Sequence, residues 1–419
     1  MNDNISTRDF NRRDYVKVTI LGLAISALWG SLHSIVLPLR LLDLVDESMK
    51  NTYLGLLTLT GLLLAMAVQP IAGAISDHSS FGWGRRRPYI LMGVIVAILL
   101  IPGIGLVESY AAIFVIYCLM QVSTNTAQGP FQALIPDLVP EGKRGTASGI
   151  KSLLEIVGGL GLVYLIVYTG NSFTSQGASW LWLVLGIIAS LLLITMLITI
   201  ITVREKAATA VSQAPLLPTL YKSFRIDLKK NPGFIYFLAS RLLFVMALTT
   251  MQSFAFYFIQ DVVGAADPTT ATTELLVAVG IGMVVSVYPA GWLSDRLGRK
   301  PILASSGLIG ALGILMLFFA PGYGYVLLGG ALMGIAGGIF LSSSWALATD
   351  LVPKNEEARY LGLTNLATAG GAALARLIGP AIDFFNSYSF GLGYQVMLLA
   401  CFIYFIGGSA LIVKIKERN

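Results

Sequence analysis

Twelve long apolar runs, separated by short polar segments, dominate the pattern of hydrophobic and polar positions along the chain. Most are about 20 residues or longer, the length of helix that crosses the hydrocarbon core of a bilayer. Membrane-spanning strands are shorter and alternate in polarity, which these runs do not. The pattern therefore predicts an all-α membrane protein with 12 transmembrane helices, at residues 16–42, 52–76, 88–107, 110–136, 146–169, 178–203, 233–260, 272–294, 301–320, 323–349, 359–383 and 391–413.

Composition agrees with this pattern. The 419 residues are 56% hydrophobic and only 12% charged, with a mean hydropathy of +0.77. A soluble domain carries about 25% charged residues, so a soluble fold is excluded. The first run, 16–42, is too long for the core of a cleavable signal and is expected to be a spanning helix. Cys118 and Cys401 lie inside predicted spans, so no disulfide framework or metal site is expected.

Most Lys and Arg residues lie on one side of the predicted membrane. They occur in the amino-terminal segment, in the loops that follow every second run, and in the tail, whereas only Arg40 and Lys50 fall on the opposite side. By the positive-inside rule, both termini are cytoplasmic. We therefore expect a multi-pass protein of the cytoplasmic (inner) membrane. The net charge of +6 requires no nucleic-acid partner.

Two loops share one sequence element, at residues 69–88 and 291–301. Each runs through Gly-x-x-Ser-Asp and ends in clustered Arg or Lys before a Pro; the second reads GWLSDRLGRKP. Asp77 and Asp295 are 218 residues apart, but the closing prolines are 213 apart because the first loop is five residues longer. The same two offsets relate three further pairs: Asp43 and Asp261 at 218, Asp137 and Asp350 at 213, and Gly149 and Gly362 at 213.

This single insertion reconciles all the pairs and indicates an internal repeat. The chain is predicted to contain two parallel six-helix repeats. The first, 1–203, has a cytoplasmic amino terminus. A cytoplasmic linker at 204–232 joins it to the second, 233–419, which ends in a cytoplasmic tail.

Together, the twelve runs, the repeat and GWLSDRLGRKP resemble the major facilitator superfamily over the whole chain. QPIAGAISD followed by GRRRP is similar to the sucrose–proton symporter group, and the glycoside–pentoside–hexuronide cation symporters are broader neighbours. Trp29, nine residues before Pro38, and the run from Asn125 to Pro130 also fit that group. The resemblance implies alternating access and sugar symport.

One departure from the resemblance concerns the proton site. In the sucrose symporters, the position four residues before Asn125 carries an Asp taken as the proton site. Here that position is Gln121, which cannot titrate, so this role is not carried over. Gln132 likewise stands where that group often has a basic residue.

The repeated loop is a candidate gate. Asp77 and Asp295, at the cytoplasmic ends of their helices, can cap a neighbouring helix or pair with loop arginines. Such contacts would hold the halves together and break when the carrier opens inward; the alternative is a topological anchor. The predicted gating residues are Asp77, Arg85, Arg86, Arg87, Asp137, Asp295, Arg296, Arg299 and Asp350.

A polar stripe marks the fourth predicted helix. Gln121, Asn125, Gln128 and Gln132 are spaced by 4, 3 and 4 residues, which places them on one helix face. Such a face should not point at lipid. It fits a water-filled cavity for hydroxyl-rich solutes, the alternative being hydrogen bonds between helices.

A carboxylate lies deep in the fifth helix. Glu155 is roughly 14 Å into the span, and its counterpart at the 213-residue offset is Thr368, so it is not a framework residue. Carboxylates inside membranes commonly carry protons. Glu155 is therefore the predicted proton-coupling site, the alternative being a permanent ion pair with Lys151 four residues earlier or with an arginine.

Two arginines also lie within spans. Arg376 shares a face with Asn365 and Asp383, and needs as partner an anion or a carboxylate such as Asp383 or Glu155. Arg241 shares a face with Gln252 or reaches back to the cytoplasm. If either binds ligand, an anionic sugar such as a hexuronide is favoured; the alternative for each is a structural ion pair.

Aromatic and imidazole side chains complete the predicted site. Trp29 and Trp345 could stack on a sugar ring and His33 could bind substrate or titrate, although each could instead be a packing residue. The predicted substrate-binding residues are Trp29, His33, Gln121, Asn125, Gln128, Gln252, Trp345, Asn365 and Arg376.

Enzyme signatures do not occur in the sequence. It has two His, two Cys, no metal-spaced cluster and no Walker-type loop, so no metal, cofactor or ATP drive is expected. We expect a monomeric secondary transporter of a small molecule, with protons favoured over sodium as the coupling cation and the lipid bilayer as its surroundings. The alternatives are efflux of drugs or amphiphiles, an uncoupled sugar facilitator, and a non-transporting sensor.

Overall fold

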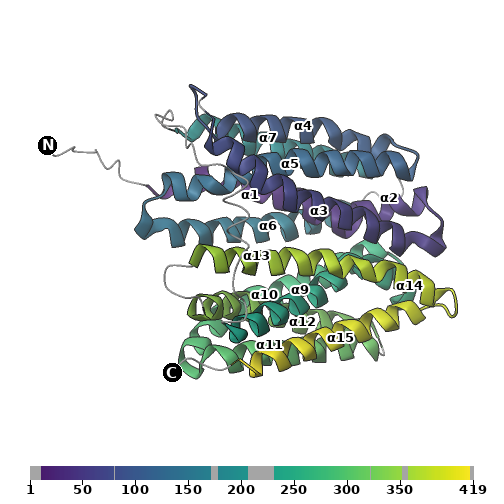
Figure 1. Ribbon diagram of the computed structural model, residues 1–419. Helices are drawn as coiled ribbons and strands as arrows, with labels where there is room; N and C mark the ends of the chain where they lie inside the picture. The colour runs from purple at the N-terminus through teal and green to yellow at the C-terminus, as the bar shows by residue number, and fades with distance from the viewer. Residues whose placement is uncertain are drawn as a thin grey trace. The chain divides into compact units, whose positions relative to one another are not determined.

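A computed structural model describes residues 11–79, 81–170, 178–205, 231–320, 322–351 and 357–415. Every element in these ranges is a helix, and they contain no strand (Figure 1). Ten of the described helical segments are long and apolar enough to cross a membrane, judged by length and composition. The all-helical prediction is confirmed. Most of the predicted linker, 204–232, lies outside the described residues.

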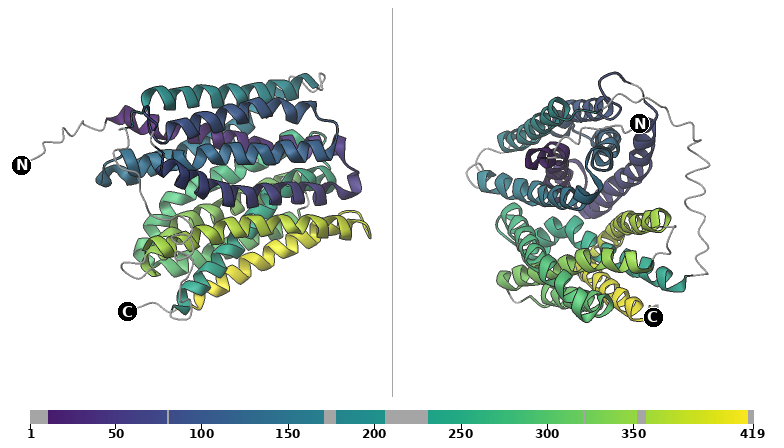
Figure 2. Two further views of the ribbon diagram at one scale, coloured as in Figure 1. Left: turned by 45° about the horizontal axis from the view of Figure 1, so that its top comes forward. Right: turned by 90° about the vertical axis from the view of Figure 1, so that its left-hand side faces the viewer.

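Contacts between residues divide the chain into two units. Unit 1 comprises Met1–Leu32 and Leu63–Gln213, and unit 2 comprises His33–Leu62 and Ala214–Asn419. In the right-hand view of Figure 2, the helices of each unit are seen nearly end-on and run alongside one another. The segment His33–Leu62 lies in unit 2, although it belongs to the first predicted repeat.

Unit 1 is built from long helices with glycine at a close approach. Its elements are α1 (Arg12–Ser31), the later part of α3 (Lys50–Asp77), α4 (Arg87–Leu106), α5 (Tyr110–Leu138), η3 (Glu141–Lys143), α6 (Arg144–Gly170) and α7 (Ala178–Thr202). α1 packs on α6, and α4 packs on α5 and α7. A Cβ atom at Gly158 of α6 would collide with the carbonyl oxygen of Leu23 in α1, so only glycine allows this packing.

Unit 2 contains the rest of the described chain. Its elements are η1 (Leu32–Val36), α2 (Leu37–Leu44), η2 (Glu47–Met49), the start of α3, α9 (Pro232–Phe258), η5 (Ile259–Val263), α10 (Pro268–Leu297), α11 (Arg299–Phe318), α12 (Tyr323–Leu351), α13 (Glu357–Leu374), η6 (Ala375–Leu377), α14 (Ile378–Asn386) and α15 (Leu392–Val413). α12 packs against both α10 and α11, and α9 packs against α13 and α15.

The α9–α13 contact in unit 2 repeats the α1–α6 contact in unit 1. A Cβ atom at Gly371 of α13 would lie 2.7 Å from the carbonyl oxygen of Leu242 in α9. Gly371 is 213 residues after Gly158, the offset found in the sequence repeat. The same packing device therefore recurs at the matched position of each unit.

Two predicted spans are less regular than the sequence suggests. The span 16–42 contains the π-helical turn η1, which carries His33. The span 359–383 is interrupted by the 3₁₀ turn η6, which carries Arg376. Irregular helical turns of this kind are frequent at functional sites.

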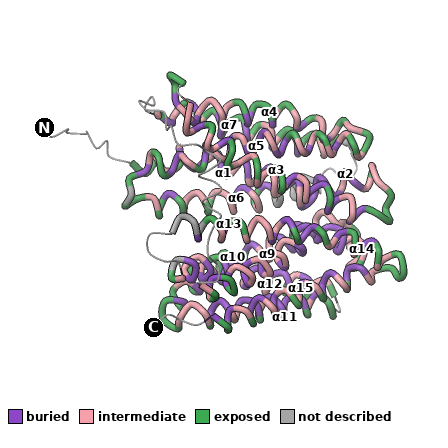
Figure 3. Tube along the Cα trace, viewed as in Figure 1, coloured by how far each residue is buried: buried purple, intermediate pink, exposed green. Residues whose placement is uncertain are grey.

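Large apolar side chains remain exposed on several helices, as is expected for helices in lipid. Figure 3 shows exposed positions along many of the helices. On α4, Leu99 is 73% exposed, and on α10 Tyr288 is 82% exposed. In a soluble protein such surfaces would be buried against a partner. Their presence here agrees with the hydropathy of the same segments.

Candidate functional site

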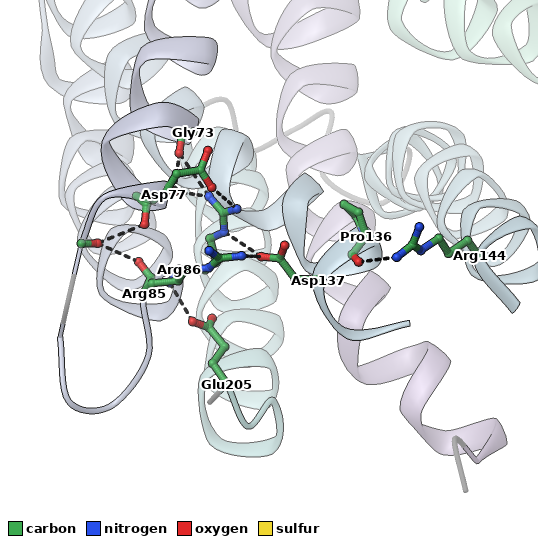
Figure 4. A network of polar contacts seen from close by, with 10 residues as sticks. Gly73, Asp77, Arg85, Arg86, Pro136, Asp137, Arg144 and Glu205 are labelled. Carbon is green, nitrogen blue, oxygen red and sulfur yellow. Dashed lines mark hydrogen bonds and ion pairs between the residues drawn. The ribbon is translucent and has the colours of Figure 1, made fainter. Parts of the chain in front are cut away.

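The repeated loop of unit 1 forms a charge cluster around Arg86 (Figure 4). The Arg86 side chain is 4% exposed and lies between two carboxylates. Its Nη2 atom pairs with Asp77, and its Nε donates to Asp137 Oδ2 at 3.0 Å. Its Nη1 donates to the Gly73 carbonyl at 3.1 Å and to Ser76 Oγ at 2.5 Å. The guanidinium thus links the end of α3 to the end of α5.

Neighbouring residues extend this Arg86 cluster. Arg85 Nη2 lies 2.8 Å from Asp137 Oδ2, and its hydrogen bond to that carboxylate raises the pKa of the Arg85 guanidinium. The backbone N–H of Arg86 donates to Glu205 Oε2 at 2.8 Å, just beyond the end of α7. Arg87 donates to the carbonyls of Trp83 and Ile200. The cluster therefore ties α3, α4, α5 and α7 together within unit 1.

The second loop copy, in unit 2, retains only part of this arrangement. Arg299 Nη1 lies 2.9 Å from Asp350 Oδ2, which matches the Arg86–Asp137 pair at the 213-residue offset. The Arg296 guanidinium stacks 4.0 Å from the Trp292 ring centroid. Asp295 is exposed, and no described residue forms an ion pair with it. Within the described residues, the second copy thus has no counterpart of the Arg86–Asp77 pair.

The polar stripe of α5 runs from a buried, hydrogen-bonded end to an open end. Gln121 Nε2 donates to the Tyr117 hydroxyl at 2.9 Å, and Asn125 Nδ2 donates to Gln121 Oε1 at 3.1 Å. Trp29 of α1 packs edge-on against Tyr117, with ring centroids 5.7 Å apart. Gln128 is half-buried and Gln132 is exposed. The structure therefore brings Trp29, Gln121 and Asn125 together through Tyr117, which the sequence analysis missed.

Glu155 of α6 forms an ion pair with Lys151 at 2.7 Å. Both side chains are partly exposed, at 28% and 18%. Glu155 also contacts α1, because a Cβ atom at Gly22 would lie 3.2 Å from its Cγ. The carboxylate is thus half-buried and paired, rather than isolated in the apolar part of the helix.

Arg241 of α9 lies inside unit 2 with 4% of its surface exposed. Its Nε donates to Thr368 Oγ1 at 2.8 Å, and its Nη1 donates to Ser344 Oγ. The guanidinium carbon lies 4.9 Å from the Trp345 ring centroid and 5.4 Å from that of Phe340. Trp345 is thereby placed beside a cation.

The other predicted residues of unit 2 are more dispersed. Arg376 is 6% exposed and donates to the carbonyl of Ala372. Gln252 and Asn365 are exposed, and His33 is partly buried. The structure brings Trp345 together with Arg241, but no described contact joins Gln252 or Asn365 to either of them.

A second charge cluster, not predicted from the sequence, surrounds Lys50 in unit 2. Lys50 Nζ lies 2.8 Å from Asp261 Oδ1, with side-chain exposures of 4% and 8%. The Tyr394 hydroxyl donates to Asp261 Oδ2 at 2.6 Å. Asp383 accepts from Asn51 Nδ2 at 2.8 Å and from the Thr52 backbone N–H at 2.6 Å.

Signals for this Lys50 cluster were present in the sequence. Lys50 is one of the two basic residues that depart from the positive-inside pattern, and Asp261 is a repeat-matched acid. The other exception, Arg40, pairs with Asp43 at 2.8 Å, and Asp43 is the repeat counterpart of Asp261. Both exceptions are thus explained by ion pairs with matched aspartates. Asp383, considered above as a partner for Arg376, instead caps the first turn of α3.

These features define a class of protein. Long apolar helices with lipid-facing side chains, polar helix faces and ion-paired loop ends are those of a multi-pass membrane transporter, not an enzyme. The family model described as MFS/sugar transport protein matches residues 21–407. The chain therefore belongs to the MFS/sugar transport family of the major facilitator superfamily.

Curated relatives match parts of the chain. The lactose permease of Leuconostoc lactis is 21% identical over 343 residues, which cover 75% of this chain and 53% of the permease. The sucrose transport protein SUT1 of Oryza sativa subsp. japonica is 35% identical over 114 residues, 22% of this chain and 21% of that protein. The minor myo-inositol transporter IolF of Bacillus subtilis is 32% identical over 103 residues, 25% of this chain and 24% of IolF. The chain thus spans about half, or less, of the length of these relatives.

Solved structures share the fold. The crystal structure of the nucleoside transporter NupG superposes with a TM-score of 0.75 at 15% identity, covering 96% of this chain and 99% of that chain. A bacterial homologue of the human lysosomal transporter Spinster, in an inward-facing and unoccupied conformation, gives a TM-score of 0.68 at 17% identity, covering 98% and 95%. At these identities the likeness establishes the fold.

Proposed function

We propose that this chain is a secondary active transporter that moves a sugar or glycoside by alternating access, coupled to a cation that is a proton rather than sodium. The observation that carries the proposal is the amide chain of α5, in which Asn125, Gln121 and Tyr117 hydrogen-bond in series beside Trp29. Amides and hydroxyls next to an aromatic ring are the groups that bind sugar hydroxyls and a sugar ring face.

The architecture we propose has 12 spanning helices in two parallel six-helix repeats, residues 1–203 and 233–419, with both termini in the cytoplasm. Two observations support the repeats: the matched glycines, Gly158 and Gly371, and the matched Arg–Asp pairs at the loop copies. The distribution of Lys and Arg supports the orientation in the cytoplasmic membrane. The protein acts as a monomer in this proposal.

Sugar as the substrate is supported by relatives. Those matched are named as transporters of lactose, sucrose and myo-inositol, and another, from Lactiplantibacillus pentosus, as an isoprimeverose transporter. The test is uptake into proteoliposomes across a panel of these four solutes, with and without an inward proton gradient. Uptake of at least one solute, enhanced by the gradient, is the expected result. If no sugar enters, the proposed substrate class is wrong.

Glu155 is the proposed coupling carboxylate. When Glu155 releases Lys151 it can take up a proton, so protonation and ion pairing exclude each other. Glu155→Gln should abolish accumulation against a gradient while sugar exchange between equal pools continues. Glu274→Gln is the matched control, because Glu274 is a carboxylate in another span, bonded to the Tyr323 hydroxyl at 2.6 Å. If Glu155→Gln still accumulates sugar fully, Glu155 is not the coupling carboxylate.

An uncoupled sugar facilitator is the second candidate function. The observation that favours it is the Lys151–Glu155 pair itself, since a permanently neutralised carboxylate carries no proton. In that case, sugar uptake in the same proteoliposomes is unaffected by proton or sodium gradients, and Glu155→Gln leaves uptake unchanged.

A further inference from the structure

The cation of Arg241 has no acidic counterpart in the described part of the chain. Every group it contacts is neutral: two hydroxyls, on Ser344 and Thr368, and two aromatic rings, on Trp345 and Phe340. No described carboxylate lies within 4 Å of it. By contrast, Arg86 and Lys50, which are equally buried, each pair with an aspartate.

An unpaired, desolvated cation is costly for a fold to keep. Taking a charge out of water carries a penalty that aromatic faces and hydroxyls offset only in part. A fold that needed only packing at this position could use an apolar residue. Retention of a guanidinium without a protein anion therefore points to an anion that comes from outside the chain.

The guanidinium of Arg241 has donors left for such an anion. Arginine has five N–H donors, and the two hydroxyl acceptors use one each, on Nε and Nη1. Nη2 makes no hydrogen bond within the described residues, so its N–H donors are available to a ligand. Nη1 and Nη2 together offer a fork that matches the two oxygens of a carboxylate.

The internal repeat shows that this cation is not part of the common framework. At the 218-residue offset, the counterpart of Arg241 is Leu23, and at the 213-residue offset that of its partner Thr368 is Glu155. The α1–α6 contact of unit 1 thus carries an acid where the matched α9–α13 contact of unit 2 carries a base.

We propose that Arg241 binds a carboxylate of the transported solute, so that the substrate class is a sugar or glycoside bearing one carboxylate. This inference rests on the proposed sugar transport. A phosphorylated sugar fits less well, because a phosphate carries nearly two negative charges, whereas the groups facing Arg241 add hydroxyls and rings but no second cation. The indole of Trp345 and the hydroxyl of Thr368 lie against the same guanidinium and would border such a carboxylate.

The test compares two solutes that differ at one carbon. Methyl glucuronide carries a carboxylate at C6 where methyl glucoside carries a hydroxymethyl group. Uptake of each into proteoliposomes is measured for the unsubstituted protein, Arg241→Gln, Arg241→Lys and Arg13→Gln. Arg13 is an exposed arginine of α1 outside the site and controls for loss of one charge.

The unsubstituted protein should take up the glucuronide in preference to the glucoside. Arg241→Gln should lower glucuronide uptake about tenfold or more, the usual effect of losing a charge-assisted pair of hydrogen bonds. Arg241→Lys should fall between, and Arg13→Gln should change nothing. Preference for the glucoside, or equal loss of both solutes in Arg241→Gln, would overturn the assignment and leave Arg241 a structural residue.

A binding measurement separates this inference from sugar transport itself. Thermal unfolding of the purified protein in detergent is followed with glucuronate, with glucose and with inorganic phosphate. A rise in the unfolding temperature with glucuronate that Arg241→Gln abolishes supports the carboxylate site even if no sugar is transported. No rise with glucuronate refutes it even if neutral sugars are transported, and a rise with phosphate alone refutes the choice of a carboxylate.

Discussion

The two buried ion-pair clusters of this chain differ in which parts of the sequence they join. The Arg86 cluster of unit 1 is made entirely within the first predicted repeat, from Gly73 to Asp137, with Glu205 just beyond it. The Lys50 cluster of unit 2 joins Lys50, from the first predicted repeat, to Asp261, from the second. The two cations are equally buried, each with 4% of the side chain exposed.

This difference separates a permanent structural contact, here called a scaffold, from a contact that must open during transport, here called a latch. An ion pair inside one repeat can stay closed while two repeats rock, but an ion pair that joins the repeats has to open. The Arg86 cluster therefore fits a permanent tie between helix ends. In the topology predicted from the sequence, the Lys50 cluster lies on the side of the membrane opposite the basic loops. It therefore fits a contact that opens and closes in the proposed transport cycle.

Loss of Arg86 should have the largest effect on stability. Arg86→Ala removes the buried cation that Asp77 and Asp137 share and its bonds to the Gly73 carbonyl and Ser76 hydroxyl, although Asp137 keeps Arg85 as a partner. Breaking a buried pair from one side costs about 3 kcal/mol, at the low end of the usual range because Asp77 is 46% exposed. A marked fall in the unfolding temperature of the purified protein in detergent, followed by circular dichroism, is the measurement.

Arg299→Ala is the matched control in the second loop copy. Arg299 is 29% exposed and its partner Asp350 is 53% exposed, so the pair is worth at most about 1 kcal/mol. Equal losses in Arg86→Ala and Arg299→Ala would show that burial does not distinguish the two copies, and that the Arg86 cluster is no more of a scaffold than its counterpart.

The Arg86 cluster could be predicted from the sequence in part, and the Lys50 cluster could not. Asp77 and Arg86 lie nine residues apart in the repeated loop, so their pairing could be anticipated from spacing and charge, whereas Asp137 comes from the end of α5, 51 residues after Arg86. The Lys50–Asp261 pair spans 211 residues, and charge distribution marked Lys50 only as an exception. Contacts between distant helices depend on how the helices pack, which a single sequence does not specify.

The candidate site residues show the same contrast: contacts within one helix could be predicted from spacing, and contacts between helices could not. The 4–3–4 spacing on α5 places Gln121 and Asn125 on one helix face, and there they hydrogen-bond to each other. Tyr117, also on that face, was overlooked because a tyrosine in an apolar run reads as packing. The neutral surroundings of Arg241 could not be foreseen, because Thr368 and Ser344 come from two other helices.

Loss of Lys50 should have an intermediate effect on stability, and it should also lower transport. Lys50→Ala removes the cation next to Asp261, but the Tyr394 hydroxyl still donates to this carboxylate. The cost to the closed latch is therefore about 2 kcal/mol, the range for a buried polar group that loses one of its partners. The proposed cycle should therefore shift away from the state that holds this contact, and net uptake into proteoliposomes should fall. The comparison is with Arg86→Ala, which is expected to lower the unfolding temperature through unit 1.

A second variant decides whether charge is the cause. Lys50→Ala combined with Asp261→Ala removes both charges, so no buried charge is left unpaired and part of the lost stability should return. If the double variant loses as much unfolding free energy as Lys50→Ala and Asp261→Ala lose separately and added together, the two residues do not act as a pair.

The smallest effect is expected at Asp383, which binds neutral donors rather than a cation. Its carboxylate accepts from the Asn51 amide and from the Thr52 N–H in the first turn of α3, where negative charge is favoured. Asp383→Asn keeps one acceptor oxygen and loses the charge, so about 1 kcal/mol of unfolding free energy should be lost. Asp46→Asn is the control, because Asp46 is an exposed cap that accepts from the Ser48 N–H and asparagine caps equally well. Thermal unfolding of both variants gives the comparison: a loss in Asp383→Asn as large as that in Lys50→Ala would mean that this helix cap stabilises the Lys50 cluster as much as the Lys50–Asp261 pair does.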